Sequence, residues 1–400
     1  MRSAIVALLE KDPEITVCGT AKDGQDCLAK VAQLQPDIIT LDVEMPRMDG
    51  LATLKELMRT SPLPVLMVSS LTAEGAETTL KALEYGALDF IAKVSGADQE
   101  DFGVELRHKV KSIARRKAFL RLRYTRTNLE AGRSTSPSSA ATSSSSSFGS
   151  ARPSSLSSGL SRTSGTSSLS GSTSLASRQS ATARPSLRSA TPAAGASAPA
   201  AGGIIRPCSG AHDIVVIGVS TGGPPVVQKI LSALPANFPA CILVAQHMPA
   251  TFTGPFAKRL DSVCQISVTE AANGDKIQNG HAYVCPGGKH IGIQMRGPLP
   301  EVLVTTEPTS ALYKPSVNVL METAGNGLGR RVLGVMLTGM GSDGCEGAKV
   351  LKQRGGYLIA QNEASCVVYG MPKAVVDAGL ADQILDVDDI AKAIMACVKG

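Results

Sequence analysis

A long stretch in the middle of the chain has almost no large apolar side chains, and this feature constrains the fold more than any other. Residues from about 131 to 203 are mainly Ser, Ala, Thr, Gly and Pro, without helical or strand periodicity. Such a segment buries too little apolar surface to offset its loss of entropy on ordering, which is typical of a flexible linker. The sequence therefore predicts two folded domains, at residues 1–120 and 205–400, joined by a linker at 121–204.

The positive charge of the chain is concentrated in this linker. No acidic residue occurs between Glu130 and Asp213, whereas seven arginines do, and removing them from the net +6 leaves the rest near −1. A nearly neutral pair of domains gives no case for nucleic-acid binding. No helix-turn-helix pattern follows the linker either, which argues against a DNA-binding response regulator.

The cysteines and the apolar runs indicate the compartment. The nine cysteines are scattered and contain no C-x-x-C pair, which argues against a disulfide framework or a zinc site. No apolar run approaches the roughly 18 residues that a membrane helix needs, and the N-terminus lacks the order of a signal peptide. We expect a cytoplasmic monomer without membrane insertion.

Both domains alternate short apolar runs with helical patterns, which predicts α/β folds with doubly wound parallel sheets. In the N-terminal domain the expected strands are residues 15–19, 37–42, 65–69 and 88–91. In the C-terminal domain they are residues 214–219, 241–246, 281–285, 302–305, 332–337 and 357–361.

Three polar side chains follow successive apolar runs of the N-terminal domain. Asp42 opens the turn Asp-x-x-Met-Pro-x-Met-Asp-Gly, and Ser69 and Lys93 follow the next two runs. Because open α/β sheets bind ligands at the carboxyl ends of their strands, these groups predict a phosphoryl-acceptor site. Asp42 would be the nucleophile, Lys93 would neutralise phosphate charge, and Ser69 would donate to a phosphoryl oxygen. Each residue alone is also compatible with an ordinary polar strand end.

On these residues the domain resembles the receiver domains of bacterial response regulators, over roughly 1–120. The resemblance implies a flavodoxin-like fold, phosphorylation of Asp42 by a histidine kinase, and Ser69 and Phe90 at switch positions. It also implies Mg²⁺, bound by Asp42 with an acidic pair that follows the first strand. This sequence instead opens in a predicted helix at 1–9, without that strand or the acidic pair, so Asp42 is only part of a metal site.

The missing strand has a structural consequence, because in the strand order 2-1-3-4-5 it lies inside the sheet. We expect two strands to lack their shared partner and apolar helix faces to be exposed. Two explanations stay open: the stated start is internal to a longer reading frame, or the receiver is degenerate. We expect metal-dependent phosphotransfer to the chain as written to be weak or absent.

The first apolar run of the C-terminal domain leads into the turn Gly218-Val-Ser220-Thr-Gly222, which has the G-x-S-x-G pattern of a nucleophile turn. A serine there projects its hydroxyl, and nearby backbone N–H groups can hold an oxyanion. The motif alone is weak, since glycine-rich turns after strands also bind phosphates or merely turn.

A serine nucleophile needs a base and an orienting carboxylate. His247 follows the run at 241–246, at the same expected edge as Ser220, and is the best general base. His290 is a reserve candidate, or a residue of the site wall that contacts substrate. Asp343, in a glycine-rich loop after the run at 332–337, is the carboxylate expected to fix the imidazole tautomer.

At these residues the C-terminal domain resembles the catalytic domain of the chemotaxis protein-glutamate methylesterases, over nearly all of 213–398. The matching motifs are Ile217–Pro224, Gln246–Pro249, Phe252–Leu260, Pro286–His290, Lys314–Asn318, Leu337–Gly344 and Gln361 through Pro372. The resemblance implies a Rossmann-like domain with Ser220, His247 and Asp343 as the triad. It places Thr221 and Met340 at the oxyanion hole and substrate site.

The implied reaction is hydrolysis of glutamate methyl esters, and probable deamidation of glutamines, on methyl-accepting chemoreceptors, without a metal or other cofactor. In that family the unphosphorylated receiver covers the active site, and phosphorylation by the chemotaxis histidine kinase relieves this. The alternative is a receiver-bearing adaptor that binds chemoreceptors without catalysis. A Ser220→Ala change separates the two, since an adaptor would keep its function.

Overall fold

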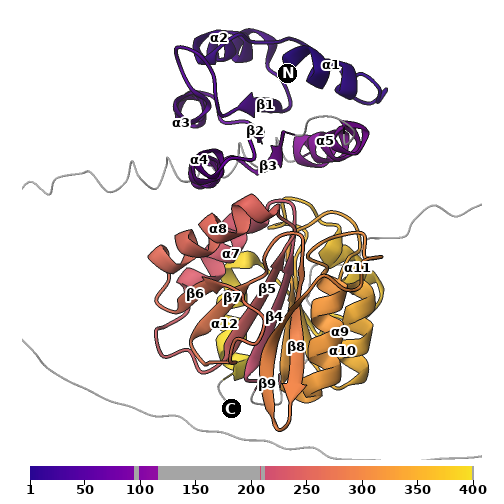
Figure 1. Ribbon diagram of the computed structural model, residues 1–400. Helices are drawn as coiled ribbons and strands as arrows, with labels where there is room; N and C mark the ends of the chain where they lie inside the picture. Colours follow the sequence, from indigo (N-terminus) through magenta and orange to yellow (C-terminus); the bar gives the residue numbers. More distant parts are fainter. Residues whose placement is uncertain (94–98, 116–207, 209–211, 399–400) are drawn as a thin grey trace, which may run out of the picture. The chain divides into compact units, whose positions relative to one another are not determined.

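The computed structural model describes residues 1–93, 99–115, 208 and 212–398 (Figure 1). The linker predicted at 121–204 lies outside the described residues. The N-terminal and C-terminal parts are each described separately below. Within the described residues, no helix is long and apolar enough to cross a membrane.

The N-terminal part is an α/β fold around a small parallel sheet. Its strands are in the order β1-β2-β3, and all pairs are parallel. The elements are α1 (Arg2–Leu9), α2 (Gly24–Leu34), β1 (Ile39–Asp42), α3 (Gly50–Thr60), β2 (Val65–Ser69), α4 (Ala73–Glu84), β3 (Asp89–Ala92) and α5 (Gln99–Ala114).

Local sequence explains where several of these elements begin. The carboxylates of Asp23 and Asp49 accept hydrogen bonds from backbone N–H groups in the first turns of α2 and α3, and the Thr72 hydroxyl does the same for α4. Every residue of β2 is buried, as expected for a central parallel strand with helices on both faces.

The strand predicted at 15–19 is wrong. That segment has no strand partner, and among the described residues no backbone–backbone hydrogen bond reaches residues 16–21. The physical reason is that β1 pairs only with β2, so no strand lies between β1 and this segment to form hydrogen bonds with it. Alternating apolar residues such as Ile15 and Val17 therefore produce an extended segment without a ladder.

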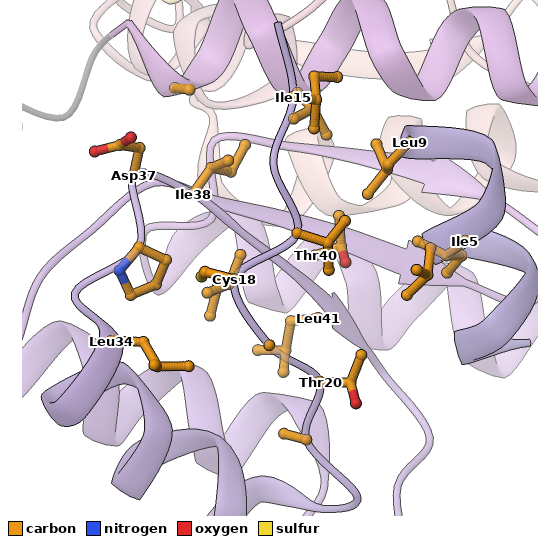
Figure 2. A pocket seen from close by; sticks show the side chains of 18 of the residues that line it. Ile5, Leu9, Ile15, Cys18, Thr20, Leu34, Asp37, Ile38, Thr40 and Leu41 are labelled. Atoms are coloured by element: carbon orange, nitrogen blue, oxygen red, sulfur yellow. The ribbon is translucent and has the colours of Figure 1, made fainter. Parts of the chain in front are cut away.

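A cavity of about 620 Å³ lies beside this segment (Figure 2). Its walls include Ile5 and Leu9 of α1, Ile15 of the extended segment, and Ile38 and Thr40 at β1. The backbone N–H groups of Ile39 and Val43 donate to the carbonyls of Pro64 and Val68, on the β2 side. Because N–H groups alternate in direction along a strand, those of the intervening Thr40 and Asp42 point to the cavity side. Two extended segments therefore lack a shared partner, as expected. The expected exposure of apolar helix faces is wrong, because Leu8 and Leu9 of α1 and Cys27 and Val31 of α2 are buried.

The C-terminal part is built on a parallel sheet with strand order β12-β11-β10-β4-β5-β7-β6. Its first elements are β4 (Ile214–Val219), α7 (Gly223–Ser232), β5 (Cys241–Gln246), α8 (Ala250–Val263), β6 (Ser267–Glu270), β7 (His281–Val284), β8 (His290–Arg296) and β9 (Leu299–Thr305). The remaining elements are α9 (Val317–Leu328), the 3₁₀ turn η1 (Gly329–Arg331), β10 (Val332–Met336), α10 (Cys345–Gln353), β11 (Tyr357–Gln361), α11 (Met371–Asp377), β12 (Gln383–Leu385) and α12 (Val387–Val398).

Helices cover both faces of this sheet, with α7, α8 and α12 on one side and α9, α10 and α11 on the other (Figure 1). Alternate residues of β4 pack into the two resulting cores, Val215 and Ile217 into one and Ile214 and Val216 into the other. Burial on both faces explains why β4, β5 and β10 read as continuous apolar runs.

The predicted strand at 302–305 is real, but its predicted place in the parallel sheet is wrong. It belongs to β9, which pairs only with β8 in a separate antiparallel hairpin. Sequence reasoning missed β6, β8 and β12. The edge strands β6 and β12 are short and mostly not buried, so their residues lack the apolar run that marks a central strand.

The topology places the carboxyl ends of three buried strands together. From β4 the chain proceeds to the adjacent β5, then to the edge strand β6 and back to β7 between them, and later returns to the other side of β4 with β10. Such a reversal is a topological switch point, where open α/β sheets form their binding crevices.

We expect the full chain to bind the dye anilinonaphthalene sulfonate at the N-terminal cavity, because accessible apolar surface binds such dyes. Ile5→Glu puts a charge in the cavity wall and should reduce the fluorescence enhancement. Leu299→Glu, at an exposed position of the C-terminal part, should leave it unchanged. Equal enhancement in the wild-type and Ile5→Glu proteins, with equal thermal unfolding, would contradict this assignment.

Candidate active site

Ser220 lies in the tight turn between β4 and α7. Its N–H donates to the Thr338 carbonyl at 3.0 Å, and its own carbonyl accepts from Gly223 N–H at 2.8 Å. Gly222 has φ = +74°, and a Cβ there would come within 2.4 Å of the Val367 side chain. Both the left-handed backbone and the close approach require glycine at this position.

His247 follows β5 and lies between a hydroxyl and a carboxylate. Its Nδ1 is 3.0 Å from Ser220 Oγ, and its Nε2 is 2.9 Å from Asp343 Oδ2. An ionised carboxylate only accepts, so the neutral imidazole carries its proton on Nε2 and offers Nδ1 to the serine hydroxyl. The imidazole is therefore oriented to take a proton from Ser220.

Asp343 is held at the start of α9 by several donors besides His247. Its carboxylate accepts from Ser316 Oγ at 3.0 Å and from the N–H groups of Val317 and Asn318 at 2.7 and 3.1 Å. Burial acts to raise the pKa of Asp343, but the hydrogen bonds from His247 and the α9 backbone outweigh it and lower the pKa. The helix N-terminus also favours negative charge, so Asp343 stays ionised.

The turn after β10 approaches Ser220 closely. A Cβ on Gly339 would meet Ser220 Cβ at 2.8 Å and Met371 Sδ at 2.4 Å, so only glycine leaves room for the serine. Thr221 is buried and its carbonyl accepts from Thr338 Oγ1, whereas Met340 is half-buried in the same turn. Their assignment to the oxyanion hole and substrate site stays a prediction.

The prediction that His290 contacts substrate or serves as a reserve base requires correction. Its side chain is fully buried, its Nδ1 accepts from Ser316 N–H at 3.1 Å, and its Nε2 lies 3.3 Å from the Pro308 carbonyl. Burial lowers the pKa of His290, and Lys314 adds to this against the opposing Pro308 contact. His290 thus supports Ser316, which in turn holds Asp343.

Sequence reasoning gave no role to Ser316 or to Gln246. Gln246 Nε2 donates to the carbonyls of Ser220 and His247, at 3.0 and 3.2 Å, and links the two turns. Both are buried polar residues. Their only signal in the sequence is that each lies inside a motif carried by the family resemblance, at the boundary of an apolar run.

In the N-terminal part the structure brings together two of the three predicted groups. Lys93 Nζ is 2.7 Å from Asp42 Oδ1, which also accepts from Glu44 N–H. The Ser69 hydroxyl is fully buried and donates to the Gly75 carbonyl at 3.1 Å, so it is engaged within α4 and not with Asp42. Phe90 is buried in β3.

The donor set at Asp42 does not match a complete magnesium site. Within the described residues, no group of three or more His, Cys, Asp or Glu side chains could hold a metal ion. The carboxylate of Asp42 itself is paired with Lys93. Mg²⁺ is commonly bound by one or two carboxylates together with water and phosphate oxygens, and the ion pair with Lys93 competes for the Asp42 carboxylate.

Two family models match the chain. The model described as "CheB methylesterase" matches residues 215–394, and the model described as "Response regulator receiver domain" matches residues 1–100. These matches coincide with the two described parts, and they confirm the family resemblances drawn from the sequence motifs.

Several known proteins are similar over nearly the whole chain. A Nitratidesulfovibrio vulgaris protein named protein-glutamate methylesterase/protein-glutamine glutaminase 2 is 56% identical, over 99% of this chain and 95% of the relative. A Lawsonia intracellularis protein named protein-glutamate methylesterase/protein-glutamine glutaminase is 47% identical, over 99% and 96%. The crystal structure of the Thermotoga maritima CheB methylesterase catalytic domain is 38% identical with a TM-score of 0.45, over 46% of this chain and 98% of that one.

We expect His290 to make the stability of the protein depend on pH. Its folded-state pKa is lowered, so its contribution to the free energy of unfolding is complete above the ordinary pKa of 6.5 and is lost as pH falls through the folded-state value. His290→Asn keeps an acceptor for Ser316 N–H but cannot be protonated. Denaturant unfolding should therefore vary less with pH below 6.5 in this variant, by at most about 1.4 kcal/mol per pH unit. Identical pH dependence in both proteins would refute this.

Proposed function

The chain belongs to the protein-glutamate methylesterase/protein-glutamine glutaminase family, and we propose that its C-terminal part hydrolyses glutamate methyl esters through Ser220, His247 and Asp343. The observation that carries the proposal is the unbroken hydrogen-bonded series from Ser220 Oγ through both ring nitrogens of His247 to Asp343 Oδ2. Full-length similarity to named enzymes, together with this series, disfavours a non-catalytic adaptor.

In the proposed acyl transfer each step is carried out by a named atom. Ser220 Oγ attacks the ester carbonyl while His247 Nδ1 accepts its proton, and Asp343 stabilises the resulting imidazolium through the Nε2–H bond. The oxyanion lies at the turn before α7, where backbone N–H groups and the helix N-terminus favour negative charge. His247 then returns the proton to the leaving methoxide, which departs as methanol.

Water completes the cycle by the same route in reverse. His247 Nδ1 takes a proton from a water molecule as the water attacks the acyl-serine. His247 then returns that proton to Ser220 Oγ as the bond between Oγ and the acyl group breaks, which frees the serine and releases glutamate. An amide passes through the same tetrahedral intermediate, so a glutamine side chain would yield glutamate and ammonia. The side chains described supply every proton transfer in this scheme, and it requires no metal or other cofactor.

We place this activity in chemotaxis, on the cytoplasmic portions of methyl-accepting chemoreceptors, with the protein acting as a monomer. We propose a histidine kinase of the same pathway as the partner of the receiver domain, with Asp42 as the residue that it would phosphorylate. Support for the Asp42 assignment comes from its ion pair with Lys93 at the carboxyl ends of β1 and β3.

We expect Ser220→Ala to lower kcat for methanol release from methylated receptor membranes by a factor on the order of 10⁴ to 10⁶. Ser232→Ala, which changes an exposed serine at the end of the neighbouring helix α7, is the matched control and should retain full activity. Both variants should unfold at the wild-type temperature. Methanol release by Ser220→Ala at the wild-type rate would exclude the esterase mechanism, and no release by the wild type would exclude the activity itself.

We expect Mg²⁺-dependent phosphorylation of Asp42 in this 400-residue chain to be weak, because one carboxylate paired with Lys93 holds Mg²⁺ poorly. The measurement is labelling by a small acyl-phosphate donor with and without Mg²⁺, with Asp42→Asn as the background. Methanol release should correspondingly differ little with and without the donor. Strong labelling that requires both Mg²⁺ and Asp42 would contradict the prediction.

A further inference from the structure

An aromatic side chain lies flat against the imidazole of His247. The ring of Tyr313 stacks on it with centroids 4.4 Å apart and planes inclined by 14°. Tyr313 is half-buried and belongs to the segment between β9 and α9. A parallel stack at this separation is a close contact between two rings, one of which must change charge during the reaction.

The segment that carries Tyr313 is fixed at both ends. The Pro308 carbonyl lies against His290 Nε2, and Ser316 bonds to both His290 and Asp343. Between these points, Gly288 N–H donates to the Lys314 carbonyl at 3.1 Å. The backbone on either side of Tyr313 is thereby attached to the elements that hold the proposed triad.

The imidazole needs such support because its ring torsion is soft. The terminal torsion of histidine has a broad energy minimum, and only the bonds to Ser220 and Asp343 otherwise define the ring plane. The bond to Ser220 is broken whenever Nδ1 gives its proton to the leaving group. A ring stacked on one face prevents the imidazole from turning out of the plane that contains both partners.

The stack also favours one charge state of the imidazole. The face of an aromatic ring carries negative potential, which attracts a cation placed over it. His247 is an imidazolium in both tetrahedral intermediates, so the attraction is greater there than in the free enzyme. An interaction that strengthens toward the transition state raises kcat, whereas one made equally with the ground state does not.

We propose that Tyr313 is a positioning residue, which holds the imidazole of His247 in register with Ser220 and Asp343 and stabilises its protonated form. This inference rests on the proposed hydrolase function. The imidazole interacts with Ser220, Asp343 and Tyr313 in the described structure. Burial raises the pKa of the Tyr313 hydroxyl, and Asp343 is ionised, so neither changes charge near neutral pH.

The test compares Tyr313→Phe, which keeps the ring, with Tyr313→Leu, which keeps an apolar side chain without one. We expect Tyr313→Leu to lower kcat for methanol release about tenfold with little change in KM, equivalent to about 1.4 kcal/mol in the activation barrier. The acid limb of kcat/KM should move to lower pH, because the imidazolium loses its aromatic partner. Tyr313→Phe should restore both properties, and Leu312→Ala, at an 86% exposed neighbour, should match the wild type.

A second measurement does not depend on turnover. NMR resonances of the His247 ring in the full-length protein should show the ring-current shift of a stacked imidazole in the wild type and in Tyr313→Phe, and should lose it in Tyr313→Leu. Unchanged His247 ring resonances and kcat in Tyr313→Leu, or a change in KM alone, would overturn the proposal and leave Tyr313 as a wall of the substrate site. Equal impairment of the Phe and Leu variants would overturn it as well, because the hydroxyl would then be the active feature. Failure of the wild-type protein to release methanol would refute the proposed function and leave the NMR comparison valid.

Discussion

The carboxylate of Asp343 is the point on which the rest of the catalytic geometry depends. It accepts hydrogen bonds from His247, from the Ser316 hydroxyl and from two backbone N–H groups at the start of α9. A buried carboxylate with fewer donors would carry a large desolvation penalty and tend to become protonated. With these four donors the Asp343 carboxylate stays ionised. Because an ionised carboxylate only accepts hydrogen bonds, the imidazole proton must be on Nε2. The tautomer of His247, and hence its ability to accept the Ser220 proton at Nδ1, follows from that one site.

Several layers of the structure serve to place this carboxylate and its partners. The parallel order β10-β4-β5 brings three turns to the same edge, and Gly222 and Gly339 let those turns approach closely enough for the side chains to meet. His290 fixes Ser316 from behind, and Gln246 ties the serine turn to the histidine turn. The ring of Tyr313 stacks on the imidazole of His247, which must change charge during turnover, and is proposed to support it in the same way. Each of these residues acts through hydrogen bonds or packing contacts. A substitution there would leave a buried polar group without its partner, or would disturb the packing around the site.

The N-terminal part shows the opposite situation, in which one element has no neighbour. β2 is paired on both sides and wholly buried, whereas β1 is paired on one side only and borders the cavity. The extended residues beyond that cavity keep the alternating apolar pattern of a strand but form no ladder. Strand propensity alone therefore does not make a strand, because pairing requires hydrogen-bonding partners at a fixed spacing.

The sequence by itself determined the α/β class, the central strands β2, β4, β5 and β11, and the identity of Ser220, His247 and Asp343 as groups at strand ends. It could do so because buried parallel strands are continuous apolar runs, and because their carboxyl ends meet at one edge. Only the tertiary structure decided that 302–305 joins an antiparallel hairpin, that 15–19 is unpaired, and that His290 is buried behind the site. It also decided the imidazole tautomer and revealed Ser316 and Tyr313. These features depend on contacts between residues far apart in the chain, which no local pattern of apolar and polar residues encodes.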